Sequence, residues 1–402
     1  MDLQAGLRYP LAHLPSRLRQ FMPELLRRIT APRFDLRPQE RSIAWRLHLD
    51  LPLLCGLLLV CLISLVVLYS ATGESDESVI NQAIRFGVGF AVLFVFAQIP
   101  PRTISRWAPA FFAVSCVLLI LVLFFGVIVN GAQRWLQVPG LGRFQPSEMM
   151  KLSLPIMVAW YFSQRTLPPK FLDVLAALAI VAFPTALIGT QPDLGTAILV
   201  GMSGIFILFF AGLSWRIISA AGVMAIIAVP LMYLYVLQDY QRRRIDTLFN
   251  PEADPLGAGW NIIQSKIAIG SGGLMGKGWL NGTQSRLDFL PESSTDFIFA
   301  VIGEEFGLVG IVLLLMIYLA IVGRGLFISL QASDTFGRLL GVSFSLTFCL
   351  YVVVNMGMVS GLLPVVGMPL PLVSYGGTSA VTLLASFGLL MSIHTHRRLL
   401  PP

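Results

Sequence analysis

Three carboxylates stand four residues apart in the stretch "LDFLPESSTDFIF", as Asp288, Glu292 and Asp296. A carboxylate held beside a hydroxyl group can take its proton while that hydroxyl attacks another atom. The stretch leads into a long apolar run, so we expect the acids at the edge of a membrane. Pro291 disfavours one continuous helix through all three acids. We therefore expect a loop, a turn at Pro291–Glu292, and Asp296 at the mouth of a membrane span.

Basic side chains occur in other segments that we expect on the same side of the membrane: Arg134, Lys151, Lys266 and Lys277. Such cations bind phosphates and stabilise a departing phosphate group. Combined with carboxylates, they suit a lipid-linked substrate with a phosphate-bearing head. A transporter also places charged groups between its spans, so this combination does not by itself separate an enzyme from a transporter.

The elements that must position these residues are membrane helices. The chain of 402 residues is 56% hydrophobic and 12% charged, and a soluble protein has about twice that charged fraction. Only helices and closed barrels span a bilayer, and continuous rather than alternating apolar runs select helices. We predict an all-α integral membrane protein with about ten spans, near residues 51–70, 82–100, 108–128, 149–163, 172–190, 195–212, 215–237, 296–323, 337–361 and 373–394.

The arginines predict the orientation. An even number of spans puts both termini on one side, and the N-terminal stretch, the loops of that side and the tail are all rich in arginine. The positive-inside rule places them in the cytoplasm, which leaves the long loop at about 238–295, between spans seven and eight, outside. The net charge of +7 reflects this topology and does not indicate a nucleic-acid partner.

Two regions follow from this pattern: a basic cytoplasmic N-terminal segment at residues 1–48 and a polytopic membrane domain at residues 49–398. Within the first, "LPSRLRQFMPELLRRI" sets leucines and Phe21 against arginines at helical spacing. That pattern suits a helix lying on an anionic leaflet. A disordered basic leader is equally compatible with it.

Several other site classes are disfavoured. The stretch "GSGGLMGKGWLNG" has Ser271 and Gly278 where a P-loop needs Gly and Ser or Thr, so its glycines more simply permit tight turns and close backbone approach. The pair His394 and His396 lies beside two arginines and is interpreted as a membrane-edge anchor. The four cysteines lie inside apolar runs, and no zinc-binding pattern occurs. The sequence leaves open whether a divalent cation takes part.

Seven stretches carry a resemblance to a known family: "GAQRWL", "FQPSEMMKLSLP", "QPDLGTAILV", "NPEADPLGAGWNIIQSKIAIGSGGLMGKGWLNGTQSRLDFLPE", "TDFIFAVIGEEFGLVG", "NMGMVSGLLPVVGMPLPLVSYGGTS" and "MSIHTHRR". They run from about Leu51 to Arg398, and the long central block is the most specific. The chain resembles the SEDS family, the shape, elongation, division and sporulation proteins. Within that family it is more similar to the rod-shape branch than to the division branch.

The resemblance implies a peptidoglycan glycosyltransferase in the bacterial cytoplasmic membrane. Such enzymes polymerise lipid II into glycan strands on the outer face of that membrane, for cell-wall elongation and rod shape. They work within the elongation machinery beside a class B penicillin-binding protein, a transpeptidase. The product linkage is inverted relative to the donor, so one general base is needed. The essential aspartate of the family's "TDF" motif matches Asp296.

The resemblance also suggests substrate contacts. Family motifs match Trp135 of "RW", Glu148 and Lys151 of "PSExxK", and Asp193 of "QPD". The substrate-binding residues expected from the motifs and from the charges are Arg134, Trp135, Glu148, Lys151, Asp193, Lys266, Glu304, Ser374 and Tyr375. Of these, Arg134, Lys151 and Lys266 are the candidates to hold pyrophosphate. Glu304 follows Asp296 by eight residues, about two helical turns, and so could share its face.

Structural roles remain open for the same residues. Asp296 precedes an apolar run and could simply cap a helix. Glu304 could form an interhelical ion pair, Trp135 could anchor at the interface, and Ser374 and Tyr375 could begin the last span. The family usually has Arg and His where this chain has Ser293 and Ser294, and it often has Lys in place of Asn130.

Two other functions compete with the enzyme. A lipid II flippase would favour polar residues at mid-membrane depth and inverted repeats, and we find no convincing internal repeat. A non-catalytic scaffold would instead activate the penicillin-binding protein by docking to it.

Overall fold

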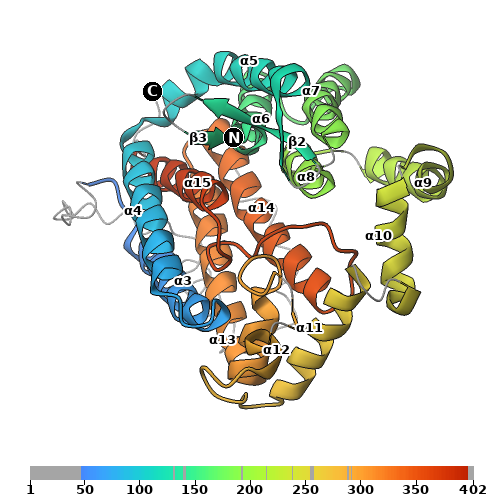
Figure 1. Ribbon diagram of the computed structural model, residues 1–402. Helices are drawn as coiled ribbons and strands as arrows, with labels where there is room; N and C mark the ends of the chain where they lie inside the picture. Colours follow the sequence, from blue (N-terminus) through green and yellow to red (C-terminus); the bar gives the residue numbers. More distant parts are fainter. Residues whose placement is uncertain are drawn as a thin grey trace, which may run out of the picture. The chain divides into compact units, whose positions relative to one another are not determined.

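The structure is a computed structural model that describes residues 47–129, 132–138, 142–191, 193–213, 215–237, 239–253, 258–287, 289–290 and 292–396. Nearly all of the predicted N-terminal segment, together with Asp288, Pro291 and Asn130, lies outside the described residues. The long helices are α3 Leu51–Ala71, α4 Asp76–Gln98, α5 Pro101–Phe125, α6 Pro146–Ser163, α7 Phe171–Thr190, α8 Leu194–Phe210, α9 Trp215–Leu231, α13 Ile298–Leu330, α14 Thr335–Val359 and α15 Thr378–Thr395. Figure 1 shows α4 beside α15 and α13 beside α14, which are the two most extensive helix pairings.

Helices occupy each of the ten predicted apolar runs. Seven helices in the described residues are long and apolar enough to cross a membrane: α3, α4, α5, α7, α13, α14 and α15. Helix α8 is a shorter apolar helix of 17 residues, and α9 continues into a π-helical turn, η1 Met232–Val236. The predominantly helical membrane fold is therefore confirmed, while length and composition alone do not fix the number of spans at ten.

The predicted long loop contains helices of its own. They are α10 Asp239–Phe249, the 3₁₀ turn η2 Pro251–Ala253, α11 Ala258–Gly272 and α12 Thr283–Arg286. Helix α11 packs against α13, so this loop forms part of the folded body.

A small sheet corrects the all-α prediction. Strands β1 Val127–Val129, β2 Ala132–Val138 and β3 Gly142–Phe144 form an antiparallel sheet in the order β1-β2-β3. Ile128 pairs with Gln133, and Gln137 pairs with Arg143. The prediction extended a membrane helix through residue 128, because the apolar "VIV" continues the run. β-Branched residues followed by Asn-Gly are in fact a hairpin signal.

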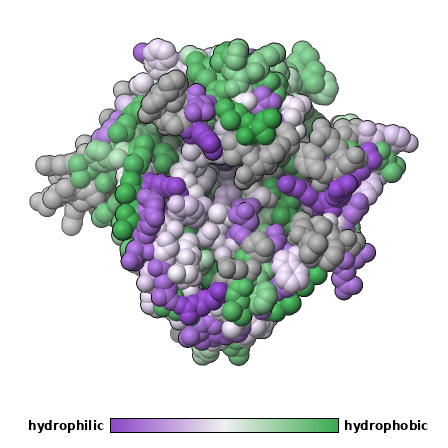
Figure 2. Space-filling model, in the orientation of Figure 1, coloured by the Kyte–Doolittle hydropathy of each residue, from purple (hydrophilic) through white to green (hydrophobic). Residues whose placement is uncertain are grey.

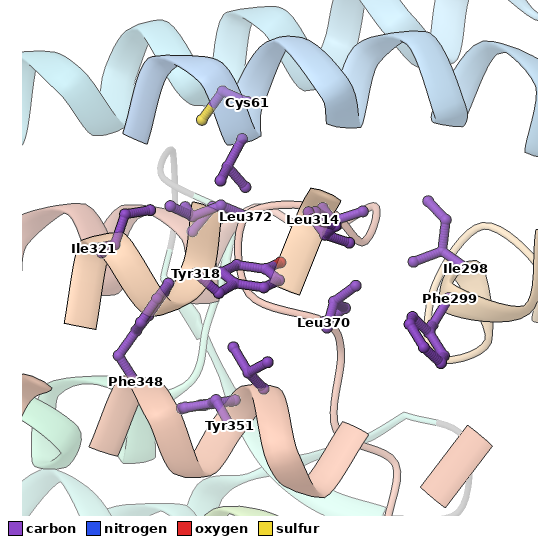
Figure 3. Packing of buried hydrophobic residues seen from close by; sticks show 14 of the residues in the cluster. Cys61, Ile298, Phe299, Leu314, Tyr318, Ile321, Phe348, Tyr351, Leu370 and Leu372 are labelled. Atoms are coloured by element: carbon purple, nitrogen blue, oxygen red, sulfur yellow. The ribbon is translucent and has the colours of Figure 1, made fainter. Parts of the chain in front are cut away.

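Buried side chains of α3, α4, α13, α14 and α15 form one hydrophobic cluster, and those of α5 to α8 form a second together with α14 and α15. Figure 3 shows Tyr318 and Phe348 in the first cluster, with Leu370 and Leu372 of the segment before α15 among them. The Tyr318 hydroxyl donates to the carbonyl of Pro371 at 2.7 Å. This irregular segment is thus fixed to the helical core.

Close backbone contacts explain two glycines. Gly307 interrupts α13 with φ 62° and ψ −159°. At this break, the amides of Lys277 and Gly278 donate to the carbonyls of Glu304 and Glu305, both at 2.9 Å. A Cβ at Gly276, whose φ is 79°, would lie 2.1 Å from the carbonyl oxygen of Glu305. The glycine-rich stretch therefore permits close backbone approach, as the sequence predicted.

We expect Gly276→Ala to lower the melting temperature of the purified protein. The substitution combines an unfavourable positive φ with a clash against backbone, and each costs of the order of 1–3 kcal/mol. Gly270→Ala is the matched control, because Gly270 lies within helix α11 and an added Cβ meets nothing within 4 Å. Equal melting temperatures for the two variants would contradict the packing argument.

Candidate functional site

Asp296 lies in the turn that leads into α13. The amides of Thr295 and Phe297 both donate to the carbonyl of Glu292, at 3.1 and 3.2 Å. The N-cap of α13 is Phe297, and no side-chain hydrogen bond caps this helix. The proposed capping role of Asp296 is therefore not what the structure shows, and its carboxylate remains available for other contacts.

The segment between α14 and α15 holds this turn in place. Asn355 donates from Nδ2 to the carbonyls of Asp296 at 2.9 Å and Met368 at 2.7 Å. The Ser374 hydroxyl donates to the carbonyl of Thr295 at 2.5 Å, and the amide of Tyr375 donates to the carbonyl of Ser294 at 2.8 Å. These bonds use backbone carbonyls, so they fix the position of Asp296 without occupying its side chain.

Burial and neighbouring charges set the proton affinity of Asp296. The pKa of Asp296 is raised from 3.8 to about 6, mainly by burial and next by the charge of Glu292. Arg134 and Arg244 act in the opposite direction. Burial therefore outweighs the cations, and the carboxylate is a stronger base than an ordinary aspartate while still ionised at pH 7.

A second group of charged residues surrounds Asp193, the N-cap of α8. Its Oδ1 accepts from the amide of Thr196 at 3.2 Å, and its Oδ2 accepts from Nε2 of Gln145 at 2.9 Å. Arg134 on β2 approaches the same Oδ2, with 3.7 Å from Nη1. Because Arg134 also lies within electrostatic range of Asp296, it connects the two aspartates.

Glu148 and Lys151 form a buried ion pair near the start of α6. Their charged atoms are 2.6 Å apart. Glu148 also accepts from the hydroxyl of Thr382 on α15 at 2.7 Å, and the Lys151 amine lies 5.3 Å from the ring centre of Tyr351 on α14. Tyr351 lies within electrostatic range of Asp193 as well. The Glu148–Lys151 ion pair is therefore a neighbour of the charged and polar residues around Asp193.

Other predicted site residues lie elsewhere. Glu304 is fully buried and accepts from Nζ of Lys277 at 2.7 Å and from the amide of Thr283 at 2.8 Å. The expectation that it shares a helical face with Asp296 is wrong, because α13 begins only after Asp296. Lys266 is exposed on α11. Its amine lies against Gly361, which follows α14, because a Cβ added at Gly361 would be 2.6 Å from Nζ of Lys266.

The half-buried Trp135 lies in β2, opposite Val127 of β1. It therefore belongs to the sheet that carries Arg134, and its ring is neither fully buried nor fully exposed. Ser374 and Tyr375 precede α15, which begins at Thr378, so they belong to the segment that holds the Asp296 turn. The prediction that the last span begins at residue 373 was five residues early.

Two cations near the site were not predicted. Arg85 on α4 stacks over the ring of Tyr375, with 4.4 Å from its guanidinium carbon to the ring centre, and no carboxylate pairs with it among the described residues. The signal was present, because Arg85 is the only charge in the predicted span 82–100. Arg244 on α10 belongs to a run of three arginines in the loop that the sequence predicts to lie outside, against the positive-inside rule.

Polar groups thus gather where helices, sheet and irregular segments meet. Figure 2 shows hydrophilic residues on several sides of a hollow near the middle of the drawn face, and hydrophobic residues gathered along its upper edge. No group of three or more His, Cys, Asp or Glu side chains that could hold a metal ion is found among the described residues. A half-buried base with Arg134 and Arg244 within electrostatic range is suited to proton transfer beside an anionic substrate.

Comparisons with known proteins agree with this architecture. The profile of the family described as "Cell cycle protein", FTSW_RODA_SPOVE, matches residues 44–399. The peptidoglycan glycosyltransferase MrdB of Escherichia coli K12 is 50% identical over 363 residues, which cover 90% of this chain and 98% of that protein. A probable peptidoglycan glycosyltransferase FtsW of Trichlorobacter lovleyi is 37% identical, with 88% of this chain and 94% of that protein covered.

Solved structures are similar too. A chain of a peptidoglycan synthase complex that coordinates polymerization and crosslinking has a TM-score of 0.76 at 30% identity, covering 86% of this chain and 97% of its own length. The rod shape determining protein RodA of Thermus thermophilus has a TM-score of 0.65 at 28% identity, covering 86% and 96%. By sequence and by fold, the chain belongs to the family of FtsW, RodA and SpoVE, the SEDS family, and within it resembles the RodA branch most.

Proposed function

We propose that this chain is a peptidoglycan glycosyltransferase that polymerises lipid II into glycan strands. The single observation that carries the proposal is the environment of Asp296: its pKa is raised to about 6, it caps no helix, and Asn355 holds its backbone carbonyl. The names of the relatives point to the same activity. We further propose ten spans, both termini in the cytoplasm, and the site on the outer face of the inner membrane.

The reaction would join two lipid-linked sugars. The 4-hydroxyl of the acceptor N-acetylglucosamine forms a bond to the anomeric carbon of the donor N-acetylmuramic acid. The bond from that carbon to undecaprenyl pyrophosphate breaks, and the pyrophosphate leaves with the electron pair. Asp296 takes the hydroxyl proton. Attack from the opposite side inverts the anomeric configuration, so no covalent sugar–enzyme intermediate is required.

Three basic side chains would bind the pyrophosphate. Arg134 and Lys151 belong to the connected group of charged residues described above, and Lys266 stands exposed on α11. Guanidinium groups bind phosphate oxygens through paired hydrogen bonds. We assign Ser374 and Asn355 to positioning Asp296, Trp135 to the edge of the cleft, and Glu304 to anchoring the loop at 277–284.

A polymerisation assay tests the proposal. The purified chain is incubated with fluorescent lipid II, with and without its class B penicillin-binding protein, and the glycan products are separated on a gel. A ladder of polymer is the expected result. Movement of lipid II across the bilayer without polymer would identify a flippase, and the absence of both activities would leave a scaffold for the partner.

Arg85→Gln is expected to lower kcat/KM for lipid II by roughly 10–100-fold. An unpaired guanidinium within a membrane helix favours an anion as its partner, and a hydrogen bond to a charged group contributes about 1.5–3 kcal/mol. The initial rate of polymer formation at several lipid II concentrations measures this effect.

Tyr375→Leu is the control for Arg85, because it removes the stacked ring and keeps the guanidinium. If Arg85 binds substrate, this variant retains most of the activity. Equal losses in the two variants would instead assign Arg85 to holding Tyr375 in place.

A further inference from the structure

A polar cavity of about 500 Å³ lies at the other end of the helices from Asp296. Arg102 and Ser105 line it from the start of α5, Gln164 from the end of α6, and Asp334 and Arg338 from the start of α14. Helix α14 separates this cavity from the Asn355 contact with Asp296 by about 30 Å, at 1.5 Å per residue. The cavity is therefore a different place from the candidate active site.

The cavity has an excess of positive charge. Arg102 and Arg338 are exposed, and neither forms an ion pair with a carboxylate among the described residues. Asp334 is the one acid of the lining. Its carboxylate lies against the first turn of α14, because a Cβ added at Gly337 would be 2.9 Å from Oδ1 of Asp334. Two guanidinium groups from separate helices thus face one cavity with a single carboxylate at its side.

This combination fits a singly charged phosphate. Guanidinium groups offer planar pairs of donors that match two phosphate oxygens. Two arginines and one aspartate give the lining a net charge of +1, which the single negative charge of a phosphodiester balances. A phosphate monoester carries up to two negative charges, and the second would be repelled by the carboxylate of Asp334. Asp334, Ser105 and Gln164 can bond to hydroxyl groups attached to such a phosphodiester.

The surroundings of the cavity favour a lipid over a soluble ligand. Trp107, near the start of α5, is 63% exposed, and Phe171 and Leu172, at the start of α7, are 70% and 75% exposed. These large apolar side chains stand near the starts of α5 and α7, two helices that contact each other. Aromatic residues gather at the level of lipid headgroups, so the cavity opens where a phospholipid headgroup would lie.

We infer that this cavity binds the phosphodiester headgroup of an anionic phospholipid that carries headgroup hydroxyls, from the leaflet on that side of the membrane. The inference does not depend on the proposed glycosyltransferase activity. It gives the Arg102 and Arg338 pair a role in lipid binding beyond orienting the chain in the membrane.

Native mass spectrometry of the delipidated full-length protein tests this inference. The protein is titrated with dihexanoyl phosphatidylglycerol, and dihexanoyl phosphatidylcholine serves as the neutral comparison. We expect one phosphatidylglycerol to bind in preference, and the double variant Arg102→Gln with Arg338→Gln to bind it at least tenfold more weakly. The double variant Arg106→Gln with Lys170→Gln loses the same charge outside the cavity and is expected to bind like wild type.

Each other outcome would overturn the assignment. Equal binding by the cavity variant and wild type would rule out the site. Displacement of the lipid by inorganic phosphate at the same concentration would identify a soluble phosphate ester as the ligand. Stronger binding of an acidic peptide, such as hexaglutamate, would identify a protein partner. Melting temperatures of both double variants are measured alongside, so that a loss of binding is not confused with unfolding.

Discussion

The Asp296→Asn variant is expected to polymerise lipid II at least about 100-fold more slowly than wild type, the range for loss of a general base. An amide has the shape of the carboxylate but does not accept the hydroxyl proton. The bonds that hold the turn run from Asn355 and Ser374 to backbone carbonyls, so the substitution leaves them intact. The rate of glycan formation in the presence of the penicillin-binding protein measures the loss.

The same variant should be as stable as wild type, or more so. Burial raises the pKa of Asp296 from 3.8 to about 6, so the folded protein holds this proton more tightly than the unfolded chain does. The resulting stabilisation is present below the unfolded pKa and is lost as the pH rises through about 6. At pH 7 the charge of the half-buried Asp296 therefore costs stability, and asparagine removes it. Normal polymerisation, or a large drop in melting temperature, would contradict the assignment of Asp296 as the base.

A pH profile adds a second check on Asp296. The activity of wild type should rise with pH through about 6, as the carboxylate loses its proton. Glu292 raises the pKa of Asp296 through its charge, so Glu292→Gln should move the rise to lower pH while keeping the plateau. An unchanged midpoint in this variant would show that another group controls the rate.

Local signals in the sequence placed Asp296 at the mouth of a span, and the family resemblance singled it out as the candidate base. The apolar run and the prolines mark the mouth of a span without reference to the rest of the chain. The contacts that position Asp296 are not local: Asn355 lies 59 residues beyond Asp296, and Ser374 lies 79 residues beyond Thr295. Only the fold shows that they hold the turn, and that Phe297 rather than Asp296 begins the helix.

Where the prediction failed, a local pattern was extended beyond its end. The separation of eight residues between Asp296 and Glu304 was converted into helical turns, but the helix that contains Glu304 begins only at Ile298. The strand at Val127–Val129 was counted as helix because it is apolar. Arg85 was overlooked because a single charge does not alter the hydropathy of a long run. Its importance appears only when Tyr375, 290 residues away, is seen to lie against it.

Lys151→Met is expected to destabilise the protein by about 3–5 kcal/mol, the cost of leaving one member of a buried ion pair alone. Glu148 is 4% exposed, and the hydroxyl of Thr382, which donates to it at 2.7 Å, would not neutralise its charge. Thermal unfolding in detergent measures the loss. Adding Glu148→Gln should restore most of the stability, because the second charge is removed and glutamine can still bond to Thr382.

The activity of that double variant decides what the ion pair is for. If the pair only joins α6 to its neighbours, a stable double variant should polymerise lipid II at a rate close to that of wild type. If the Lys151 amine also binds the pyrophosphate, the double variant should be stable but inactive, since methionine offers no donor to a phosphate. We expect the second result, because Lys151 neighbours Asp193 and Arg134 through Tyr351. Restored stability together with restored activity would remove Lys151 from the substrate site and leave it as part of the fold.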